Sequence, residues 1–183
     1  MTLDHIRNVL IHAEKTRTPV GPVSDLIPGG LTLADAHSVC EANIAARIAA
    51  GEHVRGYKGG FTNIPVREKM GLPDSTYGYI LDSMGGASGG TLAMSELIAP
   101  KIECEICFQL KAPLAGKGLT VDQVMAATGG VRASFEICDA RIKDWKCPYP
   151  DFLADNGFSA RIILGGTGWQ TPESVDLLEE EVV

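Results

Sequence analysis

Apolar residues recur at helical spacing in two stretches near the start of the chain. Thr2 precedes the first stretch as a candidate N-cap, and the apolar stripe consists of Leu3, Ile6, Val9, Leu10 and Ala13. In the second stretch, Thr32 and Asp35 resemble a capping box, and periodic apolar residues continue through Ala49 to a stop at Gly51. We predict two helices, separated by a loop, that pack on a sheet.

From Val54 onward the pattern changes to short strands and glycine-rich turns. Residues 102–110 alternate strictly, and their apolar side consists of Ile102, Cys104, Ile106, Phe108 and Leu110. Thr120 and Gln123 form a capping box for a short helix that ends at the glycines 129–130. Two further strands are predicted at 134–138 and 160–164, and a loop or hairpin connection at 85–90. Segregated helices and short mixed strands predict the α+β class.

Composition and charge narrow the class of protein. Of the 183 residues, 45% are hydrophobic and 21% are charged, which is typical of a folded globular protein. The net charge of −7 argues against nucleic acid or a membrane surface as a partner, because phosphate binding needs clustered cations. The chain has no apolar run of membrane length, no signal peptide at its start, and five cysteines that fit reduced thiols. We therefore expect a cytoplasmic protein.

Two carboxylates lie on one side of the alternating strand. Glu103 and Glu105 are about 7 Å apart along it, and two like charges at that spacing repel unless a cation or solvent lies between them. One interpretation is a solvent-facing edge strand. The other is a divalent-cation site, for which Glu136, in an otherwise apolar strand, is the natural third ligand. Oxygen ligands favour Mg²⁺ or Mn²⁺ over zinc. An ion pair of Glu136 with Arg141 or Arg132 is the alternative.

Lys58 is a candidate for substrate chemistry. It lies among glycines that let the backbone approach a small ligand closely, although an ordinary turn lysine has the same surroundings. Two other motifs predict nothing. Cys104 and Cys107 face opposite sides of a strand and have no second pair, which argues against zinc. The glycine-rich residues 165–168 lead into no helix that could hold a phosphate.

An ordered set of motifs resembles a known family. The motifs are GYKGGFT at 56–62, YG at 77–78, PKIECEI at 100–106, EICDAR at 136–141 and ADN at 154–156. Together they resemble the 2-keto-4-pentenoate hydratase / 2-oxo-3-hexenedioate (4-oxalocrotonate) decarboxylase family of the fumarylacetoacetase-like superfamily. The resemblance implies N-terminal helices packed on a mixed, barrel-like β-sheet, with residues 1–55 as a helical lead-in and 56–183 as a β-rich region of the same domain.

The resemblance also implies a site. The family resemblance implies a Mg²⁺ or Mn²⁺ ion held by Glu103, Glu105 and Glu136, with Lys58 as a catalytic or substrate-orienting residue. Substrate-binding residues carried over in the same way are Tyr77, Asp155 and Ser159. A 2-oxo acid can chelate such an ion, which then acts as a Lewis acid on the ketone and stabilises a dienolate.

Two reactions share this chemistry. The first is decarboxylation of 2-oxo-3-hexenedioate to 2-hydroxypenta-2,4-dienoate, and the second is hydration of the latter to 4-hydroxy-2-oxopentanoate. Hydratases of the family commonly carry an acid before the aromatic-glycine pair, where this chain has Thr76. The segments 112–118 and 146–151 also resemble the decarboxylases, whereas Trp145 is more like the hydratases. We expect a decarboxylase, with the hydratase as the alternative. A C–C hydrolase is disfavoured because no His–acid pair accompanies the acidic motif.

The resemblance carries expectations about completeness and partners. Family members continue beyond the equivalent of Val183 with strands that complete the sheet, so we expect a chain that lacks the C-terminal part. An inactive member that serves as a structural subunit is therefore a further alternative. The expected partners are a small 2-oxo acid, further copies in a homo-oligomer, and a sister hydratase or decarboxylase.

Overall fold

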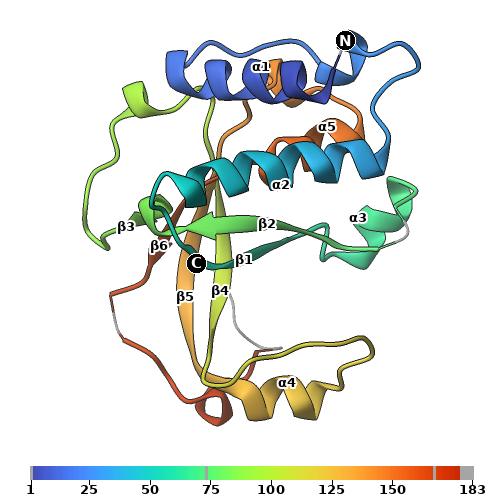
Figure 1. The fold of residues 1–183 in the computed structure, drawn as a ribbon. Helices are drawn as coiled ribbons and strands as arrows, with labels where there is room; N and C mark the ends of the chain where they lie inside the picture. The colour runs from blue at the N-terminus through green and yellow to red at the C-terminus, as the bar shows by residue number, and fades with distance from the viewer. Residues whose placement is uncertain (1, 73, 167, 178–183) are drawn as a thin grey trace.

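A computed structural model describes residues 2–72, 74–166 and 168–177. Three of its helices gather at one end of the molecule, and its strands form two sheets below them (Figure 1). The α+β class is thereby confirmed. Within the described residues the strands do not close into a barrel. No helix among these residues is long and apolar enough to cross a membrane.

Three helices form the layer above the sheets. They are α1 (Leu3–Thr16), α2 (Leu33–Ala49) and α5 (Tyr149–Ala154). The predicted caps are confirmed, because Thr2 accepts from the N–H of His5, and Thr32 and Asp35 form a reciprocal capping box. The main core lies between these helices and the ends of the strands. Its buried members include Ile6, Leu10, Val39, Ile142, Leu153 and Phe158.

A two-stranded antiparallel hairpin lies below α2. It consists of β1 (Val54–Gly60) and β2 (Thr76–Leu81), joined through α3 (Ile64–Lys69). In its register Lys58 lies opposite Gly78, and Tyr57 lies opposite Tyr79. The hairpin passes in front of the long strands of the second sheet (Figure 1). Residues on one of its faces therefore point toward that sheet.

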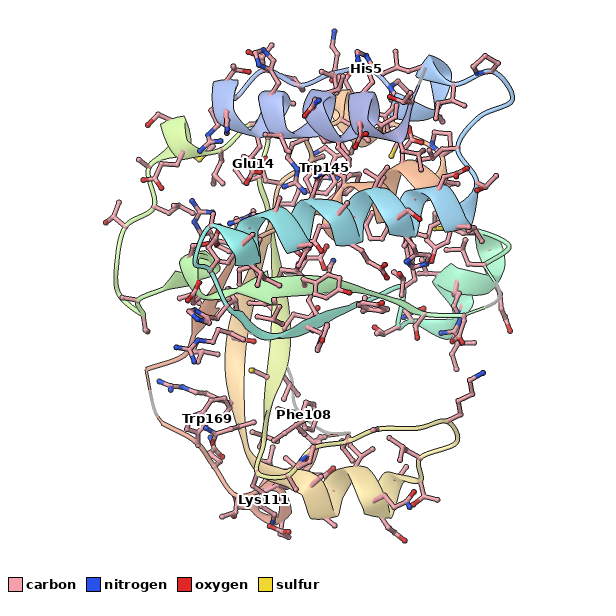
Figure 2. All side chains as sticks on the ribbon, in the orientation of Figure 1. His5, Glu14, Phe108, Lys111, Trp145 and Trp169 are labelled. Carbon is pink, nitrogen blue, oxygen red and sulfur yellow. The ribbon has the colours of Figure 1, made fainter. Side chains whose placement is uncertain are left out.

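The second sheet has four strands in the order β3-β6-β5-β4. They are β3 (Gly85–Gly86), β4 (Lys101–Leu110), β5 (Thr128–Cys138) and β6 (Ser159–Leu164). The sheet is mixed, because β3 is parallel to β6 and the other pairs are antiparallel. The helix α4 (Val121–Ala127) connects β4 to β5 at the far end, where Phe108, Lys111 and Trp169 also lie (Figure 2).

Two elements differ from the sequence prediction. The strand predicted at 134–138 begins at Thr128, and its glycines 129–130 belong to the strand instead of a turn. Backbone pairing with β4 needs no side chain at Gly130, which lies opposite Gln109. The first two residues of the loop predicted at 85–90 form β3. Short 3₁₀ helices occupy Val23–Leu26, Asp82–Met84, Met94–Glu96, Lys143–Trp145, Asn156–Phe158 and Pro172–Ser174.

Candidate functional site

The acidic residues meet on the face of the second sheet that points toward the hairpin. Glu103 on β4 lies directly opposite Glu136 on β5, and Glu105 lies opposite Ser134. Side chains at alternate positions share a face, so all three carboxylates project to the same side. Glu103 is exposed, whereas Glu136 is only 3% exposed. The register thus places the three predicted metal ligands on one face, open to solvent on the β4 side, but Glu105 is not in the group of ligand atoms that lie within 4.8 Å of one another.

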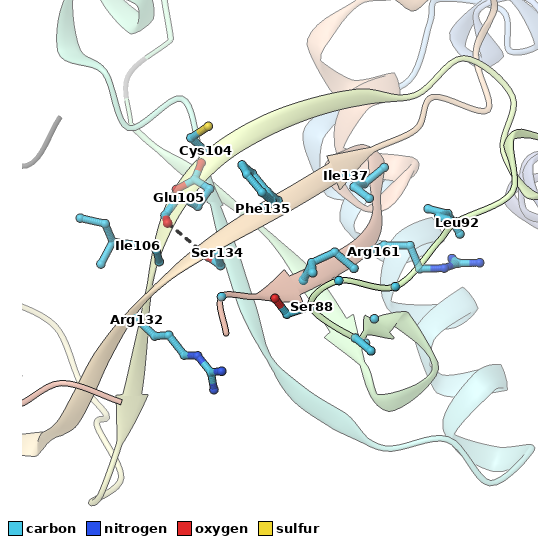
Figure 3. Close-up of a pocket in the computed structure, with 18 of the residues that line it drawn as sticks. Ser88, Leu92, Cys104, Glu105, Ile106, Arg132, Ser134, Phe135, Ile137 and Arg161 are labelled. Carbon is cyan, nitrogen blue, oxygen red and sulfur yellow. Dashed lines mark hydrogen bonds between the residues drawn. The ribbon is translucent and has the colours of Figure 1, made fainter. Parts of the chain in front are cut away.

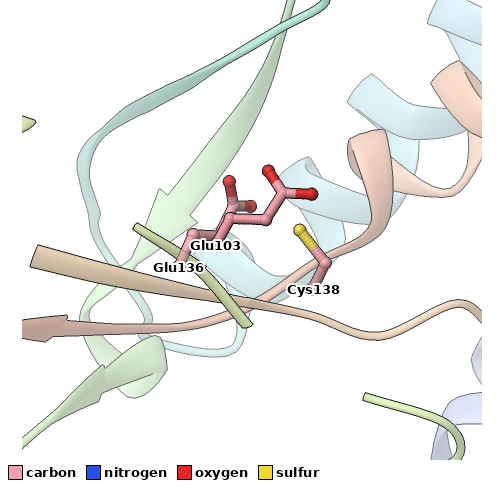
Figure 4. Close-up of side chains that lie close together, drawn as sticks. All are labelled: Glu103, Glu136 and Cys138. Carbon is pink, nitrogen blue, oxygen red and sulfur yellow. The ribbon is translucent and has the colours of Figure 1, made fainter. Parts of the chain in front are cut away.

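Cys138 joins this cluster, and sequence reasoning missed it. One ligand atom each from Glu103, Glu136 and Cys138 lie within 4.8 Å of one another (Figure 4). The signal in the sequence was its position two residues after Glu136, which places both side chains on one face of β5. Burial raises the pKa of the Cys138 thiol above its ordinary range, and the Glu136 charge adds to that shift. The thiol is therefore protonated at neutral pH.

Lys58 is the cation that faces the acids. Its Nζ lies 3.3 Å from Oε1 of Glu136, and the two side chains are 10% and 4% exposed. The ring of Phe152 covers the same ammonium, with its centroid 5.5 Å from Nζ. The alternative interpretation, an ion pair of Glu136 with Arg141 or Arg132, is therefore wrong, because the cation beside Glu136 is Lys58. The interpretation of Lys58 as an ordinary turn lysine is likewise excluded, because Lys58 lies within β1 and its side chain is largely buried.

The charges of this cluster are poorly satisfied within the described residues. Both carboxylate oxygens of Glu136 are buried, and neither accepts a hydrogen bond from a described residue. The contact with Lys58 is an ion pair only. Burial raises the pKa of Glu136, and Lys58 only partly opposes the shift. The pKa of Glu105 is also raised, first by burial and then by the charges of Glu136 and Glu103. Unsatisfied oxygens and mutual repulsion are what a bound divalent cation would relieve, so these residues fit such an ion.

Ser159 adds an unpartnered hydroxyl at the edge of this cluster. It lies at the start of β6, is 2% exposed, and its Oγ has no hydrogen-bond partner among the described residues. A Cβ placed on Gly78 would stand 2.6 Å from this Oγ and 3.3 Å from Cε of Lys58. The structure therefore brings Ser159 close to Lys58. A buried hydroxyl without a partner is a candidate donor to a ligand.

Asp155 lies in a different environment. Its carboxylate accepts hydrogen bonds from the backbone N–H and from Nε of Arg141, and both residues are buried. Burial raises the pKa of Asp155 to about 6, against the opposing charge of Arg141. Arg141 also donates to the carbonyl oxygens of Asp155 and Ser159. The carboxylate is thus occupied in holding the turn that carries Ser159, and its predicted substrate contact stays a prediction.

Tyr77 is not brought together with the acids. It alternates with Gly78 along β2, so its ring lies on the face opposite to Lys58. There it packs edge-to-face on Tyr57 at 5.7 Å and on Tyr79 at 5.7 Å between ring centroids, and it is 45% exposed. A direct substrate contact of Tyr77 also stays a prediction.

A cavity lies along the other face of the four-stranded sheet. Its volume is about 1190 Å³, and its apolar wall includes Ile106, Phe108, Phe135 and Ile163 (Figure 3). The loop 85–92 forms another wall. Of the three acids, Glu105 is among its lining residues, whereas Glu103 and Glu136 are not. Its apolar wall comes from the residues that alternate with the acids along the strands, and the cavity meets the acidic cluster at Glu105 and Ser134.

The fold and the site define an α+β protein with an acidic cluster suited to a divalent cation. No protein-family model matches the chain. A 2-hydroxypent-2,4-dienoate hydratase of Pseudomonas putida is 39% identical over 149 residues, which cover 81% of this chain and 67% of the relative. A 4-oxalocrotonate decarboxylase of Pseudomonas sp. strain CF600 is 34% identical over 168 residues, covering 91% of this chain and 64% of the relative.

A solved structure agrees with these sequence matches. The 4-oxalocrotonate decarboxylase of Pseudomonas putida G7, solved with magnesium and adipate, superimposes with a TM-score of 0.85 at 34% identity. The match covers 97% of this chain and 68% of that one. The chain belongs to the 2-keto-4-pentenoate hydratase / 4-oxalocrotonate decarboxylase family. It spans 64% of the length of another relative, the 2-hydroxyhexa-2,4-dienoate hydratase of Comamonas testosteroni, which is 36% identical.

Proposed function

We propose that this chain carries the active site of a divalent-cation-dependent lyase that acts on small 2-oxo acids of aromatic meta-cleavage catabolism. The observation that carries the proposal is the buried carboxylate of Glu136, which faces Glu103 beneath Lys58 and whose oxygens accept no hydrogen bond from the described residues. The reactions named for the relatives, diene-acid hydration and oxalocrotonate decarboxylation, support the same class.

Glu103, Glu105 and Glu136 would hold the cation, Mg²⁺ or Mn²⁺. Carboxylate oxygens are the preferred ligands of both ions, and the related structures were solved with magnesium or with calcium. A bound divalent cation supplies Lewis acidity at the 2-oxo group, where negative charge develops during either reaction. Cys138, protonated and buried beside Glu136, is a poor ligand for such a hard ion, so we leave it outside the ligand set.

Lys58 and Ser159 would handle the substrate. In decarboxylation the bond between C5 and the distal carboxylate carbon of 2-oxo-3-hexenedioate breaks and CO₂ leaves. The electron pair moves through the C3=C4 bond to the oxygen at C2, which then takes a proton. We assign to Lys58 the orientation of the substrate carboxylate and the movement of that proton, because it is the cation beside Glu136. The unpartnered Oγ of Ser159 supplies a hydrogen bond to the same substrate.

Thr76 favours decarboxylation over hydration. It lies opposite Gly60 on β2, two residues from Gly78, and therefore on the face of the hairpin that carries Lys58. Its side chain has no carboxylate that could activate water or transfer a proton to the substrate during hydration. The six-carbon dicarboxylate in the related decarboxylase structure also agrees with a substrate of that length. Hydration is the second candidate, favoured by the 36–39% identity to the two hydratases.

A coupled assay tests the proposal. 2-Hydroxymuconate, tautomerised to 2-oxo-3-hexenedioate, and, in a separate assay, 2-hydroxypenta-2,4-dienoate are supplied with and without Mg²⁺, and both substrate absorbance and CO₂ are followed. Metal-dependent CO₂ release supports the decarboxylase, and consumption of 2-hydroxypenta-2,4-dienoate without CO₂ supports the hydratase. Absence of both reactions in folded protein that binds Mn²⁺ would contradict the lyase and leave the structural subunit.

Thr76→Asp tests the choice between the two reactions. We expect the ratio of hydration to decarboxylation to rise, because an acid at this position would face the site. Thr18→Asp, at an exposed position after α1, is the matched control and should leave the ratio unchanged. An unchanged ratio in Thr76→Asp would refute the role assigned to position 76.

For the assembly of the protein we propose a homo-oligomer in the cytoplasm, with a sister hydratase or decarboxylase as partner, to be tested by light scattering.

A further inference from the structure

Asn156 binds the backbone of strand β2 through its side chain. Its Oδ1 accepts a hydrogen bond from the N–H of Tyr79 at 2.7 Å, and its Nδ2 donates to the carbonyl oxygen of Tyr79 at 2.9 Å. Cys40 on α2 donates its thiol hydrogen to the same Oδ1 at 3.6 Å. The N–H and the thiol are both donors to Oδ1, so the orientation of the amide is fixed.

These two hydrogen bonds are those that a neighbouring strand would make. β1 pairs with one edge of β2, and within the described residues no strand pairs with the other edge. Asn156 occupies that edge at its middle, from a turn whose backbone is left-handed at this residue, with φ of 52°. Asparagine adopts this conformation more readily than most residues. One side chain thus anchors the hairpin to the turn between α5 and β6.

The anchored contact is close. A Cβ placed on Gly78, the residue before Tyr79, would stand 2.5 Å from the carbonyl oxygen of Asn156. Such a distance is shorter than any ordinary carbon–oxygen contact, so β2 can approach the turn this closely only because residue 78 is glycine. The height of the hairpin above the turn is therefore set within narrow limits.

Lys58 lies within this contact. It pairs across the hairpin with Gly78, and its Cε would be 3.0 Å from a Cβ on Gly157, the residue after Asn156. The lysine side chain is thus enclosed between the hairpin and the turn, with Nζ directed at Glu136 on the other sheet. A change in the separation of hairpin and turn would move Nζ relative to the acids.

We infer that Asn156 is a positioning residue whose side-chain amide takes the place of a strand beside β2 and so fixes Lys58 over Glu136. The consequence for catalysis rests on the function proposed above. The geometric statement does not, because the enclosure of Lys58 is a property of the folded protein whether or not it turns over substrate.

Chemical labelling of Lys58 tests the geometry without an activity assay. The full chain is treated with an N-hydroxysuccinimide ester, and acylation of Lys58 is followed by mass spectrometry relative to the exposed Lys143. In Asn156→Ala we expect the relative rate to rise at least about five-fold, because the loss of two hydrogen bonds favours local opening. Asn43→Ala, which removes the amide that accepts from Arg7 between α1 and α2, is the matched control and should label like the wild type.

A second variant separates positioning from folding. Asn156→Asp retains the size, the tolerance of a left-handed backbone and the acceptor for Tyr79 N–H, but loses the donor to the Tyr79 carbonyl. It should label at a rate between the wild type and Asn156→Ala, and it decides the question should the alanine variant not fold. Labelling of Lys58 at the wild-type rate in a folded Asn156 variant would overturn the inference, as would rapid hydrogen exchange of the Tyr79 amide in the wild type.

Activity provides the catalytic readout where the lyase reaction is measurable. Asn156→Asp should lower kcat about ten-fold or more, because a small displacement of a catalytic group is costly, while Mn²⁺ affinity and KM change less than about two-fold. An equal fall in Mn²⁺ affinity would show a general loss of structure instead of a displaced lysine. A wild-type protein without turnover would contradict the proposed function and leave the labelling result valid.

Discussion

Replacement of Glu136 by glutamine tests the acidic cluster most directly. Glu136→Gln keeps the shape of the side chain and removes the charge from the one buried member of the three acids. In the wild type, both Glu136 oxygens lack hydrogen-bond donors within the described residues, and the pKa of the carboxyl is raised by burial. The charge of Glu136 therefore destabilises the cation-free protein, whereas in the presence of a cation the same charge is a metal ligand. Cation-dependent stability should report this difference.

The magnitude follows from mass action. A cation present at one hundred times its Kd stabilises the folded state by about 2.7 kcal/mol. For a chain of this size, 1 kcal/mol changes Tm by about 2–4 °C, so the wild type should gain about 5–11 °C. A variant with hundred-fold weaker affinity would gain only about 0.4 kcal/mol at the same concentration, which is about 1–2 °C.

Thermal melts of chelator-treated protein, followed by circular dichroism over a Mg²⁺ titration, measure both values. Glu68→Gln, at an exposed carboxylate on α3, is the control and should keep the full wild-type gain. Two results would refute the reasoning: a wild type whose Tm is insensitive to Mg²⁺, or a Glu136→Gln variant that gains as much as the wild type.

Three further predictions concern stability, pH and Lys58. Asp155→Asn should lower the free energy of unfolding in urea by about 3–5 kcal/mol, because it leaves Arg141 buried without its counter-charge; a loss below about 1 kcal/mol would contradict the importance of the pair. In chelator, Tm should fall as pH rises from about 5 to about 8, since Glu105 and Glu136 have raised pKa values and the folded state holds their protons more tightly than the unfolded state. Saturating Mg²⁺ should reduce that fall, and an identical pH profile with and without Mg²⁺ would argue against these acids as ligands. Lys58→Met should lower kcat at least about ten-fold with little change in Mn²⁺ affinity, and unaltered turnover would remove Lys58 from the mechanism.

Periodicity and capping residues were sufficient to predict α1, α2, α4 and the long strand, whereas the six-residue helices α3 and α5 were not predicted. The stripe that includes Ile6 and Leu10 is buried as expected, and the capping boxes at Thr32 and Thr120 mark the starts of α2 and α4. The alternation in 102–110 correctly placed Glu103 and Glu105 on one side of β4. These features depend on neighbours in sequence, which is why a single sequence contains them.

The contacts that complete the site depend on register and on the crossing of two sheets. Lys58 and Glu136 are far apart in sequence, and only the position of the hairpin over β5 brings Nζ to the carboxylate. The same applies to Asn156, whose polar side chain signals a turn but not the strand edge that it binds. Tyr77 shows the opposite case, since strand alternation places it on the other face from its neighbour Gly78.

Strand β4 borders two compartments, and its length is constrained by both. The side chains of Cys104, Ile106 and Phe108 line the apolar hollow, whereas Glu103 and Glu105 alternate with them and project to the side of the acids, where Glu105 also reaches the rim of the hollow. Insertion or deletion of one residue within this stretch would exchange the two sets, turning Ile106 toward the cation ligands and Glu105 toward Phe135. Length variation should therefore accumulate in the exposed residues 111–120 that follow, while β4 keeps its ten residues.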